Sequence, residues 1–170
     1  VLVNAFVKMT IGAVIVLVTR VSLTPWQLTV AVGGGAAYLV GSLFYFQAMQ
    51  REEASRVVPV FALWIIWAVI AAAIFFQEIF SVDIYLGILA IILGSFLVLW
   101  RPNSGLLFAG KAALLMLVST LSYALYSMAV KYLTQFHSFW IAAAYPMLGA
   151  VAVAIPVFIN VHKELRQVNR

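Results

Sequence analysis

The sequence predicts an all-α membrane protein, a six-helix transmembrane bundle, and two observations support this class. Hydrophobic residues make up 66% of the 170 residues and charged residues 9%, against about 45–50% and about 25% in soluble domains. The hydrophobic residues also gather in six long runs with short polar stretches between them: Val1–Thr19, Gln27–Met49, Val57–Phe76, Ile84–Trp100, Ala112–Val130 and Phe139–Asn160. At about 1.5 Å per residue, each run as a helix covers the roughly 30 Å hydrocarbon core of a bilayer.

The runs favour helices over strands because a helix satisfies its own backbone polar groups in lipid. A transmembrane β-barrel would need stretches of about ten residues that alternate polar and apolar, and these runs do not alternate. The first run has no basic segment before it and no cleavage site, so it does not resemble a signal peptide. Because the chain opens inside a hydrophobic segment and lacks an initiator Met, we expect a piece of a longer protein.

The first helix carries Lys8, the one charged residue inside a run. Lys8 precedes Arg20 by twelve residues, which corresponds to about 18 Å along a helix. An ionisable side chain at this depth usually faces a bundle interior or an aqueous cavity, whereas a lysine near the opposite surface can extend its ammonium to water. Both interpretations of Lys8, a pathway residue and a surface-reaching one, remain open.

Small residues recur every four positions on the second helix and at intervals of three and four positions on the fourth. Gly33, Ala37 and Gly41 form one stripe, and Gly87, Ala90 and Gly94 form the other. Such stripes let helix backbones approach closely in lipid. Both are interpreted as structural contacts between helices.

The third helix is bounded by Pro59 in its first turn and Glu78 at its end, about 28 Å apart. Trp64 and Trp67 share one face near its middle, too deep for the aromatic belt at the membrane surface. Glu78 is either a solvated acid at the interface or part of a gate. The tryptophans are either core packing or the wall of a solute cavity.

Aromatic residues with polar tips share one face on two other helices. Tyr38, Ser42 and Tyr45 recur on the second helix, and Ser119, Tyr123 and Tyr126 on the fifth. Such residues suit a cavity that combines apolar walls with a few polar contacts.

The sixth helix contains Pro146 and Pro156, which permit kinks. An echo of Ile11–Val14 in Leu148–Val151 is consistent with inverted repeats.

Charge and motif content exclude several function classes. Ten basic and five acidic residues give a formal net charge of +5, and the basic residues are scattered singly, so no nucleic-acid partner is expected. The chain contains no cysteine and no His-Glu-x-x-His, Gly-x-Ser-x-Gly or Walker motif, and no catalytic residue, cofactor or metal site is predicted. The distribution of Lys and Arg favours a cytoplasmic location for the loops that contain Arg51, Arg101 and Lys111.

The stretch from Gln47 to Trp100 resembles the EamA-type half-domain of the drug/metabolite transporter superfamily. It contains a polar turn at Gln50–Arg56, the helix with Pro59, the acidic end at Phe75–Glu78 and the glycine-spaced segment Leu86–Gly94. The resemblance implies ten helices in two inverted five-helix repeats. On that template, residues 1–100 are helices two to five of the first repeat, residues 101–111 a linker, and residues 112–170 the first two helices of the second repeat with a polar tail. It would also place Arg20 and Glu78 on the cytoplasmic side, so the orientation remains open.

The resemblance implies a multi-pass plasma-membrane transporter that moves a small organic metabolite, such as an amino acid, by alternating access. The expected pathway residues are Lys8, Tyr45, Trp64, Trp67 and Tyr126, with Pro59 and Glu78 as gate or structural residues. The expected partners are the lipid bilayer, the solute and, as an open alternative, a second copy of the chain. A lipid-carrier flippase or a non-transporting membrane scaffold of the same superfamily is the alternative function.

Overall fold

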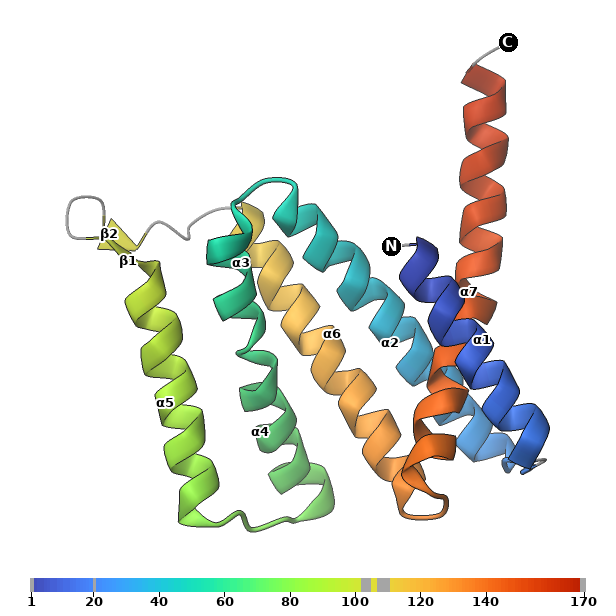
Figure 1. Ribbon diagram of the computed structural model, residues 1–170, viewed down its shortest axis with the longest axis horizontal. Helices are drawn as coiled ribbons and strands as arrows, with labels where there is room; N and C mark the ends of the chain where they lie inside the picture. The colour runs from blue at the N-terminus through green and yellow to red at the C-terminus, as the bar shows by residue number, and fades with distance from the viewer. Residues whose placement is uncertain (1, 20, 102–104, 107–110, 169–170) are drawn as a thin grey trace. The chain divides into compact units, whose positions relative to one another are not determined.

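A computed structural model describes residues 2–19, 21–101, 105–106 and 111–168, and it describes side chains for 10, 12–19, 21–55, 57–97 and 111–155. Within these ranges the chain forms seven helices and one short ladder of two strands (Figure 1). The helices are α1 Leu2–Thr19, α2 Pro25–Met49, α3 Ala54–Phe61, α4 Trp64–Phe76, α5 Val82–Leu99, α6 Lys111–Thr134 and α7 Phe139–Val168.

The predicted runs and the observed helices correspond closely, with three differences. The third run is divided into α3 and α4, and the helix of the sixth run continues beyond its expected end at Asn160. The predicted linker 101–111 and the residue before it contribute strands β1 (Trp100–Arg101) and β2 (Gly105–Leu106), which pair antiparallel with Trp100 opposite Leu106. The described structure is therefore helical except for this ladder.

Three segments of the described residues are long and apolar enough to cross a bilayer: Pro25–Met49, Lys111–Thr134 and Val57–Phe76, the last of which contains the division between α3 and α4. The apolar parts of α5 and α7, Val82–Leu97 and Phe139–Ile155, are shorter. These lengths and compositions support a membrane helical bundle.

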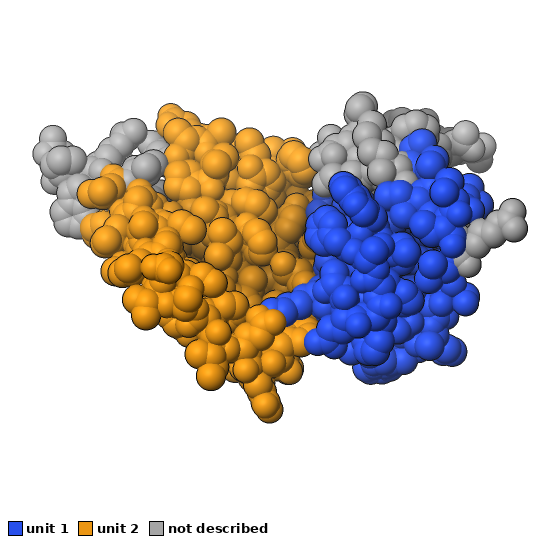
Figure 2. Space-filling model, turned by 60° about the horizontal axis from the view of Figure 1, so that its bottom comes forward, with its two compact units in different colours: residues 1–39, 129–170 blue, residues 40–128 orange. Residues whose placement is uncertain are grey.

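The chain divides into two compact units, coloured separately in Figure 2. Unit 1 comprises residues 1–39 and 129–170, and unit 2 comprises residues 40–128. The boundaries fall inside α2 and α6, so each of these helices contributes one part to each unit.

In unit 1, α2 begins with a reciprocal cap. The backbone N–H of Thr24 donates to Gln27 Oε1 at 3.0 Å, and the backbone N–H of Gln27 donates to Thr24 Oγ1 at 3.3 Å. Pro25, which has no N–H to satisfy, occupies the first helical position. Gln27 Oε1 also lies 3.3 Å from His137 Nε2, and the hydroxyl of Tyr145 donates to the carbonyl of Val21. These bonds join the start of α2 to the segment around α7.

Glycines set the close contacts of α7 in unit 1. A Cβ atom at Gly35 of α2 would overlap the backbone of Pro146 and Ala150 on α7. From the other side, a Cβ atom at Gly149 would lie 2.8 Å from Val32 Cα, and one at Gly12 of α1 would lie 3.3 Å from a carbonyl oxygen of α7. The helices approach this closely only because these positions carry no side chain.

The predicted stripes are only partly correct. On α2, Gly41 packs closely, since a Cβ atom there would lie 2.8 Å from the Tyr123 ring, whereas Gly33 faces open space among the described residues. On α5, a Cβ atom at Gly87 or Gly94 would meet no described atom within 4 Å. A four-residue spacing marks a helix face, but it does not say whether another helix covers that face.

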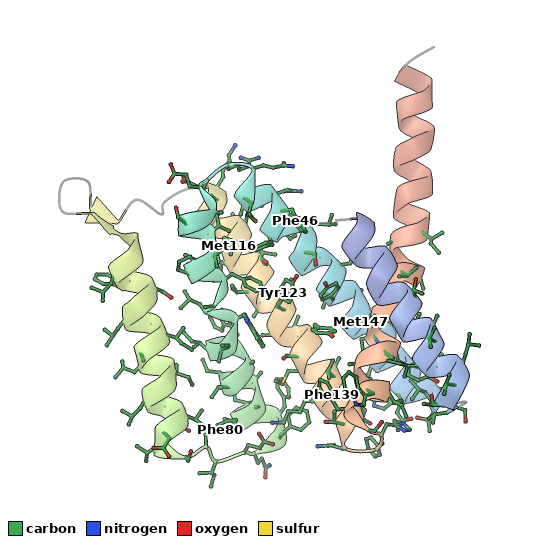
Figure 3. The ribbon with its side chains drawn as sticks, in the orientation of Figure 1. Phe46, Phe80, Met116, Tyr123, Phe139 and Met147 are labelled. Atoms are coloured by element: carbon green, nitrogen blue, oxygen red, sulfur yellow. The ribbon has the colours of Figure 1, made fainter. Side chains whose placement is uncertain are left out.

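The core of unit 2 lies where α2, α3 and α6 meet. Its fully buried side chains are Ala48 of α2, Val57 of α3 and Met116 of α6; Met116 is labelled in Figure 3. Tyr45, Phe61 and other half-buried side chains pack around them. This core holds α3 at one end of α6.

Substitutions at Gly33 and Gly35 are expected to have opposite effects. Gly35→Ala forces α2 and α7 apart and is expected to destabilise the protein by about 1–3 kcal/mol. Gly33→Ala adds a methyl group in open space and a better helix former, so it is expected to be neutral or to stabilise by up to about 1 kcal/mol. Thermal unfolding in detergent measures both. Equal losses of stability in the two variants would contradict the packing described here.

Candidate functional site

The helix predicted over Val57–Phe76 is broken at Ala62 and Leu63, between α3 and α4. The N–H of Leu63 donates to the carbonyl of Val60 at 3.1 Å, and the N–H groups of Ile65 and Ile66 also donate to carbonyls three residues back. In a regular helix these bonds would reach four residues back. The break therefore tightens the backbone for about one turn and leaves the carbonyl of Pro59 without its usual helical donor, Leu63.

Ser95 of α5 supplies the missing partner. Its hydroxyl donates to the carbonyl oxygen of Pro59 at 3.0 Å, and Ser95 itself is buried, with 7% of its surface exposed. An unpaired carbonyl in an apolar environment is costly, so this bond stabilises the break and joins α5 to α3.

Pro59 does not lie where the sequence placed it. Because α3 begins at Ala54, Pro59 is in the interior of the helix and not in its first turn. A proline there lacks the N–H that would bond one turn back. The region around the break thus has a weakened hydrogen-bond ladder on both sides of Pro59.

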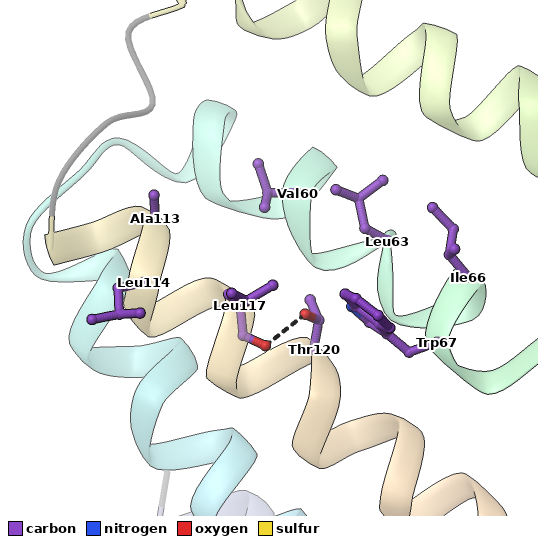
Figure 4. A pocket seen from close by; sticks show the side chains of 8 residues that line it. All are labelled: Val60, Leu63, Ile66, Trp67, Ala113, Leu114, Leu117 and Thr120. Atoms are coloured by element: carbon purple, nitrogen blue, oxygen red, sulfur yellow. Dashed lines mark hydrogen bonds between the residues drawn. The ribbon is translucent and has the colours of Figure 1, made fainter. Parts of the chain in front are cut away.

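A pocket of about 480 Å³ lies in unit 2 beside this break (Figure 4). Both halves of the broken helix line it, with Val60 from α3, Leu63 from the break, and Ile66 and Trp67 from α4. The opposite wall is one face of α6, with Ala113, Leu114, Leu117 and Thr120. The break thus shapes one whole wall of the pocket.

The pocket lining is almost entirely apolar. Six of its eight side chains are aliphatic, and none is charged. The two polar tips belong to Trp67 and Thr120, and the Thr120 hydroxyl donates to the carbonyl of Leu117 at 3.0 Å. Thr120 is almost fully buried at 2% exposure, whereas Leu117 is half exposed. The pocket therefore reaches from the surface of unit 2 to buried atoms of α6.

Polar and aromatic contacts hold α2 against α6 within unit 2. Ser42 Oγ lies 2.9 Å from Tyr123 Oη, and the hydroxyl of Ser119 donates to the carbonyl of Gly41 at 2.8 Å. Phe61 packs edge-on against both Tyr45 and Tyr123, with ring centroids 4.9 and 4.8 Å apart. The hydroxyls of Ser42, Ser119 and Tyr123 are thus engaged in bonds that join α2 to α6.

The structure places the predicted site residues in several settings. Trp67 lines the pocket, and Trp64 begins α4 directly after the break. Tyr45 belongs to the aromatic contacts of the unit 2 core, and Tyr126 lies half-buried on α6. Lys8 lies on α1, but its side chain is outside the described residues.

Glu78 is exposed and follows the end of α4. The preceding residue, Gln77, adopts the left-handed conformation with φ of 52°, which is a common way to terminate a helix. Glu78 thus lies at the end of α4 that is far from the break.

Among the described residues, no group of three or more His, Cys, Asp or Glu side chains is placed to hold a metal ion.

Sequence reasoning missed Ser95 and Thr120. Each is a hydroxyl residue inside an apolar run, and that is the only local signal either one gives. Their roles depend on partners in other segments: Ser95 bonds a carbonyl 36 residues away, and Thr120 faces a helix more than 50 residues earlier in the chain.

Comparison with known proteins identifies one family. The model of the EamA-like transporter family matches residues 1–100, more than half of the chain. No curated protein and no solved structure matches the chain.

Removing the Ser95 hydroxyl is expected to weaken the break. Ser95→Ala leaves the Pro59 carbonyl unpaired and should reduce the free energy of unfolding by about 1 kcal/mol. Ser122→Ala is the matched control, because Ser122 is equally buried and its hydroxyl bonds only within α6, to Val118 at 2.8 Å. Unfolding in detergent should separate the two variants, and identical stabilities would show that the Ser95 bond contributes nothing.

Proposed function

The chain belongs to the EamA-like transporter family, and we propose that the protein carries a small organic metabolite, an amino acid or a related solute, across the membrane by alternating access. The family consists of membrane transporters of the drug/metabolite superfamily and not of enzymes. The protein is accordingly an integral membrane protein in a lipid bilayer.

One observation carries the proposal: the pocket of unit 2 lies against a broken helix whose two halves both contribute lining residues. Broken membrane helices are tolerated where the irregular backbone is covered by protein or lines a cavity. In secondary transporters, solute sites occur at such breaks. The break and the pocket occur together here, which supports a solute site.

The break also provides a means of alternating access. Helix α3 is attached to α5 through the bond between Ser95 and the Pro59 carbonyl, whereas Ile66 and Trp67 belong to α4. A rotation at Ala62 and Leu63 would move Ile66 and Trp67 relative to Val60 and change the width of the pocket. Hinges of this kind need only a few residues that absorb the change in backbone angles.

The proposed pathway includes Lys8, Tyr45, Trp64, Trp67 and Tyr126. Trp67 is the member that lines the pocket. Pro59 is proposed as part of the hinge, since its carbonyl is the group that Ser95 holds. Glu78, at the other end of α4, is proposed as a gate residue.

A lipid-carrier flippase is the second candidate, and one observation favours it. Leu114 and Leu117 line the pocket although 62% and 50% of their surfaces are exposed. An apolar pocket with an exposed rim could admit a long-chain substrate from the side.

The proposal also includes the location and the assembly of the protein. We propose that it resides in the plasma membrane, with a homodimer as an open alternative to a single copy.

Filling the pocket is expected to block transport. Leu117→Trp adds an indole to the pocket wall and should reduce amino-acid uptake by proteoliposomes of the intact protein at least tenfold. Leu121→Trp is the matched control, because Leu121 lies one turn further along α6, is 47% exposed and does not line the pocket. Equal uptake by both variants would exclude this pocket from the pathway.

Alternating access predicts that solute changes the water exposure of the pocket. The 170 residues contain no cysteine, so Leu114→Cys introduces the only cysteine among them, on the pocket wall. Its rate of labelling by a membrane-impermeant maleimide should change several-fold when a transported solute is added. Leu125→Cys, on an exposed part of α6 away from the pocket lining, should keep its rate. A constant rate at both positions would contradict the hinge.

A further inference from the structure

The side chains of the unit 2 pocket restrict the kind of group that it can hold. Val60, Leu63, Ile66, Ala113, Leu114 and Leu117 offer only hydrocarbon surface. The hydroxyl proton of Thr120 is already engaged with the Leu117 carbonyl. The indole N–H of Trp67 and one oxygen of Thr120 are the only side-chain polar atoms that the lining residues can offer to a ligand.

This composition disfavours an ionised group in the pocket. A carboxylate or an ammonium loses its hydration when it is buried, and it needs a paired charge or several hydrogen bonds in return. None of the eight lining side chains is charged. A hydrocarbon group gains from the same environment, because its apolar surface leaves water.

The size and the aromatic wall narrow the ligand further. A volume of about 480 Å³ falls within the roughly 300–1,000 Å³ of small-molecule sites. The flat indole of Trp67 favours stacked or edge-on contact with another ring. Thr120 is buried, whereas Leu114 and Leu117 are exposed. A ligand group that contacts Thr120 therefore lies deeper in the pocket than the rim formed by Leu114 and Leu117.

We infer that the pocket beside the α3–α4 break is a subsite for an uncharged apolar group of the transported solute, a branched aliphatic or aromatic substituent. This inference rests on the proposed function, since it assigns part of the solute to that pocket. If the solute is an amino acid, its side chain enters the pocket, and its ammonium and carboxylate stay outside it. The protein then selects apolar side chains over acidic or basic ones.

Fluorescence of Trp67 offers a test that does not require transport. In the intact protein with Trp26, Trp64, Trp100 and Trp140 replaced by Phe, Trp67 is the only tryptophan within this chain's sequence. Bromobenzene, an uncharged ring with a heavy-atom quencher, should quench it saturably. 4-Bromobenzoate, the same ring with a carboxylate, should bind at least tenfold more weakly. Equal saturable quenching by both compounds would overturn the inference.

Two controls separate binding from partition into detergent or lipid. A protein that keeps only Trp140, which is 68% exposed, should show quenching that rises linearly with bromobenzene. Ala113→Leu and Ala113→Phe fill the pocket in steps and should weaken saturable quenching of Trp67 in that order, whereas Leu121→Phe should not. Unchanged quenching in both Ala113 variants would place the probe elsewhere and overturn the inference.

Lipids with brominated acyl chains test the other source of hydrocarbon. Saturable quenching of Trp67 by these lipids, with displacement of bromobenzene, would mean that an acyl chain occupies the pocket, and it would overturn the assignment to a solute. If the brominated lipids quench Trp67 no more strongly than they quench Trp140 in the protein that keeps only Trp140, the assignment of the pocket to a solute group is supported.

Uptake by proteoliposomes of the intact protein distinguishes the two proposals. Uptake of leucine or phenylalanine that exceeds uptake of aspartate and lysine at least tenfold, and that Ala113→Phe abolishes, supports both. Saturable bromobenzene binding with no uptake of any solute would contradict transport while leaving an apolar binding site. Strong uptake that depends neither on the charge of the amino-acid side chain nor on Ala113→Phe would contradict the subsite but remain consistent with transport.

Discussion

Every backbone carbonyl in the hydrocarbon core of a bilayer needs a hydrogen-bond donor from the protein, because water is absent there. Regular helices meet this requirement by themselves, but α3 and α4 meet at a break where the amide of Leu63 bonds to Val60 and not to Pro59. The hydroxyl of Ser95 takes its place. This one bond from α5 stabilises the interruption of the apolar segment Val57–Phe76 and the pocket wall that the interruption forms.

Other helix contacts in the chain rely on close approach and on paired hydroxyls. In lipid, apolar side chains gain little by leaving lipid for a protein partner, so packing and interhelical hydrogen bonds decide which helices associate. Gly35 and Gly149 bring α2 and α7 of unit 1 into backbone contact. In unit 2, Ser119 bonds the carbonyl of Gly41, and Ser42 bonds Tyr123. Small residues and hydroxyls thus hold the helices of this protein together, a role that burial of apolar surface has in soluble proteins.

The same contacts divide the chain into parts suited to different tasks. The hydroxyls of Ser42, Ser119 and Tyr123 are engaged in hydrogen bonds that join α2 to α6. The pocket between the broken helix and α6 is different, because its lining is hydrocarbon surface with only two polar side-chain tips. The proposed transport mechanism uses both kinds of region: fixed contacts that preserve the bundle, and a pocket wall that would move by rotation at Ala62 and Leu63.

The sequence by itself determined the membrane class, the approximate limits of the helices and the family, because hydropathy and run length are local properties that lipid imposes on any chain. Trp67 could be singled out from its depth in a run, and it does line the pocket. The tertiary structure alone decided that Gly35 packs closely while Gly33 and Gly87 meet no neighbour among the described residues, that Pro59 lies inside a helix, and that Ser95 donates to its carbonyl. These outcomes depend on which distant segment lies opposite each residue, 36 positions away for Ser95 and 81 for Ser42. A hydrophobic run is apolar on nearly every face, so its sequence narrows but does not determine which face meets a neighbour.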